Sequence, residues 1–256
     1  MFVKSYCGIM DEKQSNRHNH DNHQILVARK GVLLFSDDCR QNMLCGQSAA
    51  FVPRGIYHQA RGINTVFNTV YFDDEIFCHL TEYNSNKLPK QVVVFSISPL
   101  FRELLNEICK DTLVSNCVSR TALQLLFFLF YQNKQKYLPI SLPKSNDLRL
   151  SRALCYIDNY YNQFITLEDI ASVATTSKRN LERICKRELK INISDYICMR
   201  RIFSATLELA TTDNSVLSIS LNVGYNSLSS FYKAFQKFIG KTPKEYRNSL
   251  SFFEQT

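Results

Sequence analysis

The chain reads SVLSISLNVGYNSLSSFYKAFQKFIG from Ser215 to Gly240, and this stretch decides the fold of its last third. Ser215 predicts the start of a short helix, and Gly224 suits the left-handed backbone position that ends it. Ser227 predicts the start of a longer helix whose apolar residues recur at the spacing of one buried face. The residues of that face are Phe231, Phe235 and Phe238. A short helix, a tight turn and an amphipathic helix predict a helix-turn-helix over residues 216–239.

The same pattern occurs a second time, at residues 167–189. Thr166-Leu-Glu-Asp169 is typical of a capping box, with Asp in place of the usual Glu. Residues 174–176 predict the turn, and Ser177 predicts the start of the next helix. The inner face of that helix carries Leu181, Ile184 and Cys185. A long helix starting at Ser194 and spanning residues 194–211 connects the two motifs, so one pattern is present twice on one frame.

A helix after Asp147 and a last short helix from Pro243 complete an all-α domain of seven helices over residues 147–251. The second helices of the two motifs expose different residues. The first exposes Lys178, Arg179, Glu182, Arg183, Lys186 and Arg187, and the second exposes Leu228, Ser229, Tyr232, Lys233 and Lys237. Such side chains usually form a solvated face, but the second helix of a helix-turn-helix enters the major groove of DNA. Two motifs in tandem therefore indicate DNA binding.

Residues 149–249 resemble the DNA-binding domain of the AraC/XylS family of bacterial regulators. The stretches that carry the resemblance are SKRNLERICK at 177–186, Tyr196, RIFSA at 201–205, VGYNSLSSFYKAF at 223–235 and GKTPKEYR at 240–247. The sequence departs from the family pattern in three places. Cys185 replaces an aromatic residue, Glu208 stands where Leu is common, and Leu228 stands where polar residues are common.

The resemblance implies that the two recognition helices enter adjacent major-groove segments, about 34 Å apart. It implies that bases are read by Arg179, Glu182 and Arg183 in the first motif and by Ser229, Tyr232 and Lys233 in the second. Arginine suits this role because it can bond bidentately to guanine. The candidates for phosphate contacts are Ser177, Lys178, Lys186, Arg187, Ser227, Lys237, Lys241 and Lys244. The family also implies double-stranded DNA and RNA polymerase as partners.

The first half of the chain predicts strands. The apolar runs that predict them are residues 25–28, 32–35, 49–52, 66–72 and 91–95. Arg29-Lys30-Gly31 predicts a turn between the first two, and residues 1–24 are expected to be mostly irregular. Short β-branched strands at this spacing predict an antiparallel barrel or sandwich. The expected fold class is α+β, with an N-terminal antiparallel β-barrel and two helices followed by the all-α domain.

Histidines at the start of this region form a second candidate site. His18-x-His20, followed by strands and by Val52-Pro-Arg-Gly-Ile-Tyr-His58, resembles the cupin-like sensor domain of the same family over residues 16–95. His18, His20 and His58 could bind a divalent metal, with Gln24 or His23 as a fourth ligand. The alternative is a set of polar residues that contacts a small-molecule effector or the N-terminal arm. Cupin enzymes usually add a carboxylate, and no Glu follows His20 at the expected distance. DNA binding requires no cofactor.

Two helices are expected over residues 99–132, the second starting at Ser119. Its run of Leu125 to Phe130 is apolar on nearly every side, which favours either burial inside the monomer or a homodimer contact. Residues 132–145 hold three Lys and two Pro, which predicts an exposed linker between a sensor domain at 1–140 and the DNA-binding domain.

Composition narrows the function classes. The 256 residues carry 31 Lys+Arg and 23 Asp+Glu, a net charge of +8 that is divided evenly between the halves, so charge placement rather than total charge is informative. The nine cysteines lack C-x2-C and C-x4-C spacing, which argues against a cysteine zinc cluster and hence against a zinc-dependent DNA-alkylation sensor. With no secretory signal and no apolar run long enough to span a membrane, a cytoplasmic protein is expected.

We considered three hypotheses for the function of the protein. The first is a ligand-responsive transcription activator, with repression left open. The second is a metal-dependent cupin enzyme with an accessory DNA-binding tail, which would need open metal positions and substrate contacts. The third is the alkylation sensor. The first is our prediction, and it is not an enzyme.

Overall fold

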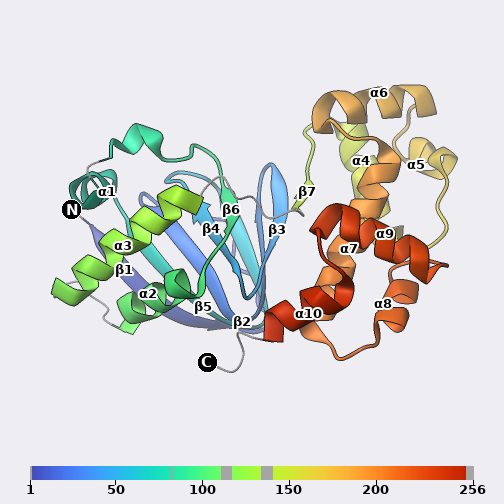
Figure 1. Ribbon diagram of the computed structural model, residues 1–256. Helices are drawn as coiled ribbons and strands as arrows, with labels where there is room; N and C mark the ends of the chain where they lie inside the picture. Colours follow the sequence, from blue (N-terminus) through green and yellow to red (C-terminus); the bar gives the residue numbers. More distant parts are fainter. Residues whose placement is uncertain (1, 82, 111–116, 134–140, 252–256) are drawn as a thin grey trace. The chain divides into compact units, whose positions relative to one another are not determined.

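The computed structural model describes residues 2–81, 83–110, 117–133 and 141–251 (Figure 1). The chain divides into two compact units. The first comprises residues 1–37, 43–138 and 250–256, and the second comprises residues 38–42 and 139–249. The domain limits 1–140 and 147–251 remain a prediction. No helix in the described ranges is long and apolar enough to cross a membrane.

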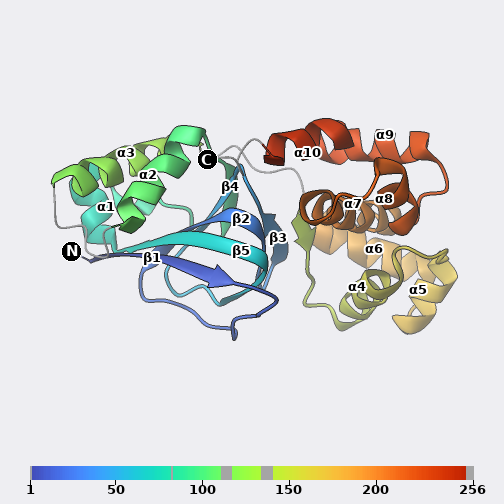
Figure 2. The same ribbon diagram turned by 90° about the horizontal axis from the view of Figure 1, so that it is seen from below.

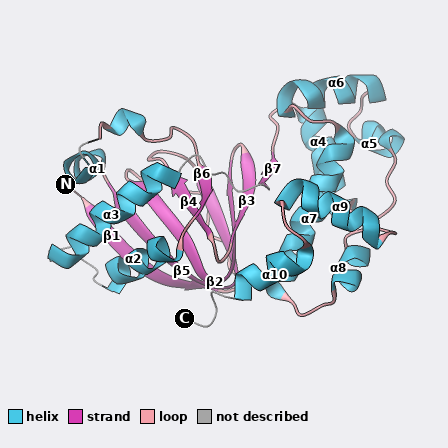
Figure 3. Ribbon diagram, viewed as in Figure 1, coloured by secondary structure: helices cyan, strands magenta, loops and turns pink. Residues whose placement is uncertain are grey.

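Most of an antiparallel sheet lies in the first unit (Figure 3). Its strands are β1 (Val3–Met10), β2 (His23–Asp37), β3 (Arg40–Leu44), β4 (Ser48–Val52), β5 (His58–Phe72) and β6 (Val93–Ser96). The strand order is β1-β5-β2-β3, and β4 pairs with both β2 and β6. No pairing among the described residues closes the sheet, so the α+β class is confirmed but the closed barrel is not.

Two local predictions for this sheet were wrong. Residues 29–31 form no turn, because β2 continues through them with a bulge in its register against β5. Gly31 supplies the positive φ of +68° that the bulge needs, and a Cβ there would lie 2.1 Å from the carbonyl oxygen of Asn64. Residues 3–10 are not irregular but form β1, an edge strand whose outer face is solvated and therefore lacks an apolar signal.

Helices cover one face of the sheet (Figure 2). They are α2 (Pro99–Lys110) and α3 (Cys117–Asn133). The first unit also contains α1 (Asp74–Thr81) and the short η1 (Ser85–Lys87), which were not predicted. Phe127 and Phe130 of α3 pack against Phe51 and Phe72 of the sheet, with ring centroids 4.5–6.3 Å apart along this cluster. α3 starts at Cys117 rather than after Ser119. Its apolar run is thus mostly core, although Leu125 and Phe128 are exposed.

The second unit holds seven helices, as predicted. They are α4 (Leu148–Tyr160), α5 (Leu167–Val173), α6 (Lys178–Leu189), α7 (Ile193–Thr211), α8 (Val216–Asn222), α9 (Leu228–Ile239) and α10 (Pro243–Ser251). Asn192 rather than Ser194 caps α7, its side chain accepting a hydrogen bond from the amide of Asp195. Leu181, Ile184, Phe231 and Phe235 are fully buried as predicted, whereas Phe238 is only partly buried.

The expected linker contains structure. Residues 40–42 of β3 pair with β7 (Ser141–Pro143), and all of these residues belong to the second unit. Leu142 is buried there, which is why this part of the linker is a strand. The rest of the linker, residues 134–140, lies outside the described residues.

Candidate nucleic-acid interface and histidine cluster

The turn between α5 and α6 is fixed by side-chain hydrogen bonds. Thr166 and Asp169 form the predicted capping box at the start of α5. Ser177 caps α6 by accepting from the amide of Asn180, whose own side-chain nitrogen donates to Thr176 Oγ1 at 2.7 Å. Thr175 in the turn has φ +55°. These contacts set where α6 begins, and hence which of its residues face outward.

The outer face of α6 is rich in cations. Its exposed side chains are Lys178, Arg179, Arg183, Lys186 and Arg187, and Glu182 is partly buried. Arg183 donates to Asn180 Oδ1 at 2.9 Å, an anchor that we did not predict. Arg179 makes no hydrogen bond or ion pair with any residue that the structure describes. Arg179 and Arg183 lie one helical turn apart, so two guanidinium groups project from the same face.

Two of the candidate phosphate contacts on α6 are already paired within the unit. Lys178 forms an ion pair with Glu168 of α5, which lowers the pKa of that carboxyl group. Arg187 lies 2.8 Å from Glu188 and 3.7 Å from Asp147. Lys186 has no such partner among the described residues.

The turn between α8 and α9 has a different construction. Gly224 adopts φ +89°, and a Cβ there would lie 2.7 Å from the carbonyl oxygen of Asn162. Ser227 then caps α9 by accepting from the amide of Ser230. α9 exposes Ser229, Lys233 and Lys237, and Tyr232 is partly buried beside Phe231, with their ring centroids 6.2 Å apart. Lys237 lies 3.0 Å from Asp195 of α7.

The remaining candidates, Lys241 and Lys244, are exposed at the start of α10. Two other arginines have a structural role that the sequence did not reveal. Arg201 donates to the carbonyl groups of Tyr161 (2.7 Å) and Gln163 (3.1 Å), just past the end of α4. Arg247 donates to those of Thr212 (3.2 Å) and Asn214 (2.7 Å), just past α7. Cations at carbonyl-rich helix ends are stabilising, so both arginines hold the frame of the motifs.

Residues 170–249 match a protein-family model described as a helix-turn-helix domain. This match lies within residues 149–249, the part of the chain that resembles the DNA-binding domain of the AraC/XylS family of transcription regulators. The melibiose operon regulatory protein of Escherichia coli K12 is 31% identical over 116 residues, which cover 45% of this chain and 38% of that protein, less than two thirds of its length. The transcriptional regulator NimR of the same organism is 25% identical over 92% of this chain and 83% of its own length. A structure of ToxT from Vibrio cholerae covers 97% of both chains at 17% identity and a TM-score of 0.41. By name, the first of these proteins is an operon regulatory protein and the second is a helix-turn-helix transcriptional regulator.

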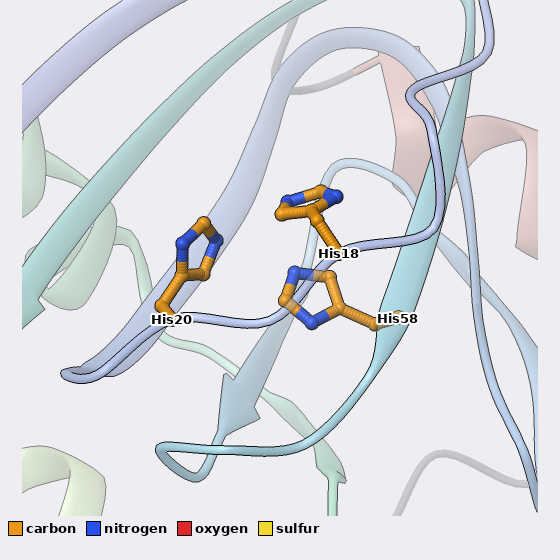
Figure 4. Close-up of side chains that lie close together, drawn as sticks. All are labelled: His18, His20 and His58. Carbon is orange, nitrogen blue, oxygen red and sulfur yellow. The ribbon is translucent and has the colours of Figure 1, made fainter.

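The first unit brings the three predicted histidines together (Figure 4). Ring centroids are 4.5 Å apart for His18 and His58, 4.7 Å for His18 and His20, and 5.1 Å for His20 and His58. His58 is 3% exposed and stacks on Phe35, whereas His18 and His20 are partly exposed. Burial lowers the pKa of His58 to about 4 and also lowers the pKa of His20. The rings of His20 and His58 are therefore uncharged at neutral pH.

The two candidates for a fourth ligand differ. His23 is engaged elsewhere, because its Nδ1 accepts from the amide of Arg54 at 3.2 Å and its Nε2 lies 3.1 Å from Asp74. Gln24 pairs with Tyr71 across β2 and β5, and its side-chain nitrogen donates to Thr69 and to Tyr71. Tyr71 in turn contacts the ring of His20, with centroids 4.9 Å apart. The sequence did not indicate Thr69 or Tyr71 as part of this site.

Proposed function

We propose that the protein is a transcription activator that reads two adjacent major-groove segments with α6 and α9. The observation that carries the proposal is the repeated geometry, two helices that each open from a capped turn and expose polar side chains on the face away from the core. A recognition helix needs this arrangement, since its first turns must approach base edges while its inner face stays packed.

The roles of individual residues follow from chemistry and placement. We assign base reading to Arg179, Glu182 and Arg183 on α6 and to Ser229, Tyr232 and Lys233 on α9. Phosphate contacts fall to hydroxyl groups at the helix starts and to the surrounding cations. They are Ser177, Lys178, Lys186, Arg187, Ser227, Lys237, Lys241 and Lys244. The cations would set affinity and its salt dependence, and the base-reading residues would set sequence preference.

Selection of duplexes from a random-sequence pool by the full-length protein tests the DNA-reading part. We expect enriched duplexes to contain two conserved segments one helical turn apart, about 34 Å along the axis. Anisotropy titrations then compare the enriched duplex with scrambled DNA. A pool without enrichment, or equal affinity for both duplexes, would overturn the proposal.

Activation is tested separately. A promoter that carries the enriched site is transcribed in vitro by bacterial RNA polymerase with and without the protein. We expect transcript levels to rise, because the family resemblance favours RNA polymerase as a partner in the bacterial cytoplasm. A fall in transcript would convert the proposal to repression while leaving the DNA-binding part intact.

The first unit is proposed to provide the sensory input and a homodimer contact. Helices α2 and α3 expose Leu100, Leu125 and Phe128, at 51%, 39% and 46% of their surface. Large apolar side chains that remain exposed favour association. In sedimentation over a concentration series we expect wild type to dimerise and Phe128→Glu to remain monomeric. Leu148→Glu, at an exposed leucine of the second unit, serves as the control. A wild type that stays monomeric would contradict the dimer.

A further inference from the structure

The three clustered histidines are held by the backbone rather than by a loose loop. His18 and His58 form an antiparallel bridge, with hydrogen bonds of 2.9 Å and 2.8 Å between their amides and carbonyl groups. The amide of Gly55 donates to the carbonyl oxygen of His20 at 2.8 Å. The segment before β2 is thereby fixed to the start of β5, and the three side chains point toward one another (Figure 4). Because the backbone of the cluster is already ordered, binding of a ligand there costs less conformational entropy.

The hydrogen bonds of the rings leave lone pairs in the centre of the cluster. His18 Nδ1 lies 2.7 Å from the carbonyl oxygen of Asn16, and His58 Nδ1 lies 2.9 Å from that of Ile56. A carbonyl oxygen only accepts, so each Nδ1 must carry the proton and each Nε2 must keep its lone pair. Metal-binding histidines use this arrangement, in which the second ring nitrogen donates to a backbone carbonyl and orients the ligand.

Two buried polar atoms beside the cluster lack partners. His20 Nε2 and Gln24 Oε1 are both inaccessible to solvent and make no hydrogen bond with the described residues. Leaving such atoms unpaired is unfavourable, because they have lost their hydrogen bonds to water without gaining others. An ion or ligand at the centre of the cluster would relieve the first of these. Gln24 is linked to the cluster through Tyr71, whose hydroxyl group accepts from the Gln24 side-chain nitrogen and whose ring contacts that of His20.

We propose that His18, His20 and His58 bind one late first-row divalent cation of the Zn²⁺ type through ring nitrogens. Their candidate ligand atoms all lie within 4.8 Å of one another. Three nitrogens around a tetrahedral zinc ion at about 2.0–2.1 Å are about 3.4 Å apart, so modest rotation of the partly exposed rings completes the set. Imidazole ligands without a carboxylate favour Zn²⁺, Cu²⁺ or Ni²⁺ over Mg²⁺, Ca²⁺ or Mn²⁺.

The test uses full-length protein freed of metal by a chelator and then titrated with Co²⁺, whose visible absorption reports its ligands. We expect one equivalent to bind per chain and to be displaced by one equivalent of Zn²⁺. His18→Ala and His20→Ala should each weaken binding roughly 100-fold or more, because each removes a direct ligand, and loss of even an outer-shell partner costs 10–100-fold. His79→Ala is the matched control, since His79 lies on α1 outside the cluster, and it should bind like wild type.

The cysteines provide the main competing site, and the spectrum separates the two. Binding to a thiolate adds a sulfur-to-cobalt charge-transfer band in the near ultraviolet, which nitrogen ligands lack. That band, an absence of saturable binding, or equal binding by wild type and the His18 and His20 variants would overturn the proposal. Circular dichroism checks that the variants are folded. Because no DNA is present, failure here is independent of failure of the proposed function.

Discussion

The two helix-turn-helix motifs have the same backbone conformation but differ in the residues at their strained positions and on their recognition helices. Each has two positions with positive φ, one in the turn and one after the recognition helix. The second motif places Gly224 (+89°) and Gly240 (+77°) there, whereas the first places Thr175 (+55°) and Lys190 (+62°). The recognition helices show the opposite contrast. Where α6 has Arg179 and Arg183, counted from the capping serine, α9 has Ser229 and Lys233. The second motif thus has the residues that best suit its backbone, and the first has the residues that best suit contacts with DNA bases.

Gly224→Ala should produce the largest effect on stability. The new Cβ would lie 2.7 Å from the Asn162 carbonyl oxygen, in a backbone conformation that L-residues avoid. Clash and strain together should lower the free energy of unfolding by about 3 kcal/mol. Urea denaturation followed by circular dichroism measures the change.

Gly240→Ala is the matched control, because its φ is similar but no atom lies within 4 Å of the added Cβ. It should cost only the left-handed conformation, about 1 kcal/mol. Equal losses for the two variants would show that the close approach to Asn162 contributes nothing.

Arg183→Ala tests the contrast in the recognition surfaces. Loss of a bidentate base contact should weaken binding to the selected site by about 1–3 kcal/mol and binding to scrambled DNA by less. Lys233→Ala, at the equivalent position of α9, should lose less discrimination because a lysine offers no planar pair of donors. Anisotropy titrations on both duplexes at one fixed salt concentration give the comparison. If Lys233→Ala loses more preference for the selected duplex over scrambled DNA than Arg183→Ala does, α9 rather than α6 contributes more to sequence discrimination.

Thr175→Gly should repair the strained turn of the first motif. A β-branched residue at φ +55° is unfavourable, and glycine removes that cost while adding backbone entropy to the unfolded chain. We expect the free energy of unfolding to rise by up to about 1 kcal/mol. Lys190→Gly, without β-branching, should gain less. A destabilised Thr175→Gly would mean that its weak contact with Arg152, at 3.5 Å, outweighs the strain.

Local signals made the second unit predictable. Ser177, Ser215 and Ser227 cap their helices as expected, because a capping side chain acts within three residues of itself. Where two capping residues stood close together, the prediction chose Ser194 and the structure uses Asn192. The error is small because the two residues are only two positions apart at the start of the same helix.

Non-local contacts limited the prediction of the first unit. The histidines were visible as a spacing, but their neighbours Thr69 and Tyr71 depend on the register of β2 against β5, which no short stretch encodes. Likewise, Arg29-Lys30-Gly31 carries turn residues, and the same glycine conformation serves a bulge once the partner strand runs alongside. Whether the sheet closes also depends on which strands pair, and the number of strands alone does not predict that pairing.

The smallest expected effect is on the salt dependence of DNA binding, and it comes from the lysines of the two recognition helices. Lys186 on α6 has no ion-pair partner among the described residues, whereas Lys237 on α9 lies 3.0 Å from Asp195. A phosphate contact by Lys186 releases one counterion, so Lys186→Ala should reduce the slope of log K against log salt concentration by about 1, equally on selected and scrambled DNA. Lys237 must give up its carboxylate before it can serve a phosphate, so Lys237→Ala should change the slope by less. Asp195→Asn would free Lys237, so this variant should have a steeper slope than the wild type. If the two lysine variants have equal slopes, internal pairing does not restrain these side chains, and the electrostatic contrast between the motifs rests on their residue types alone.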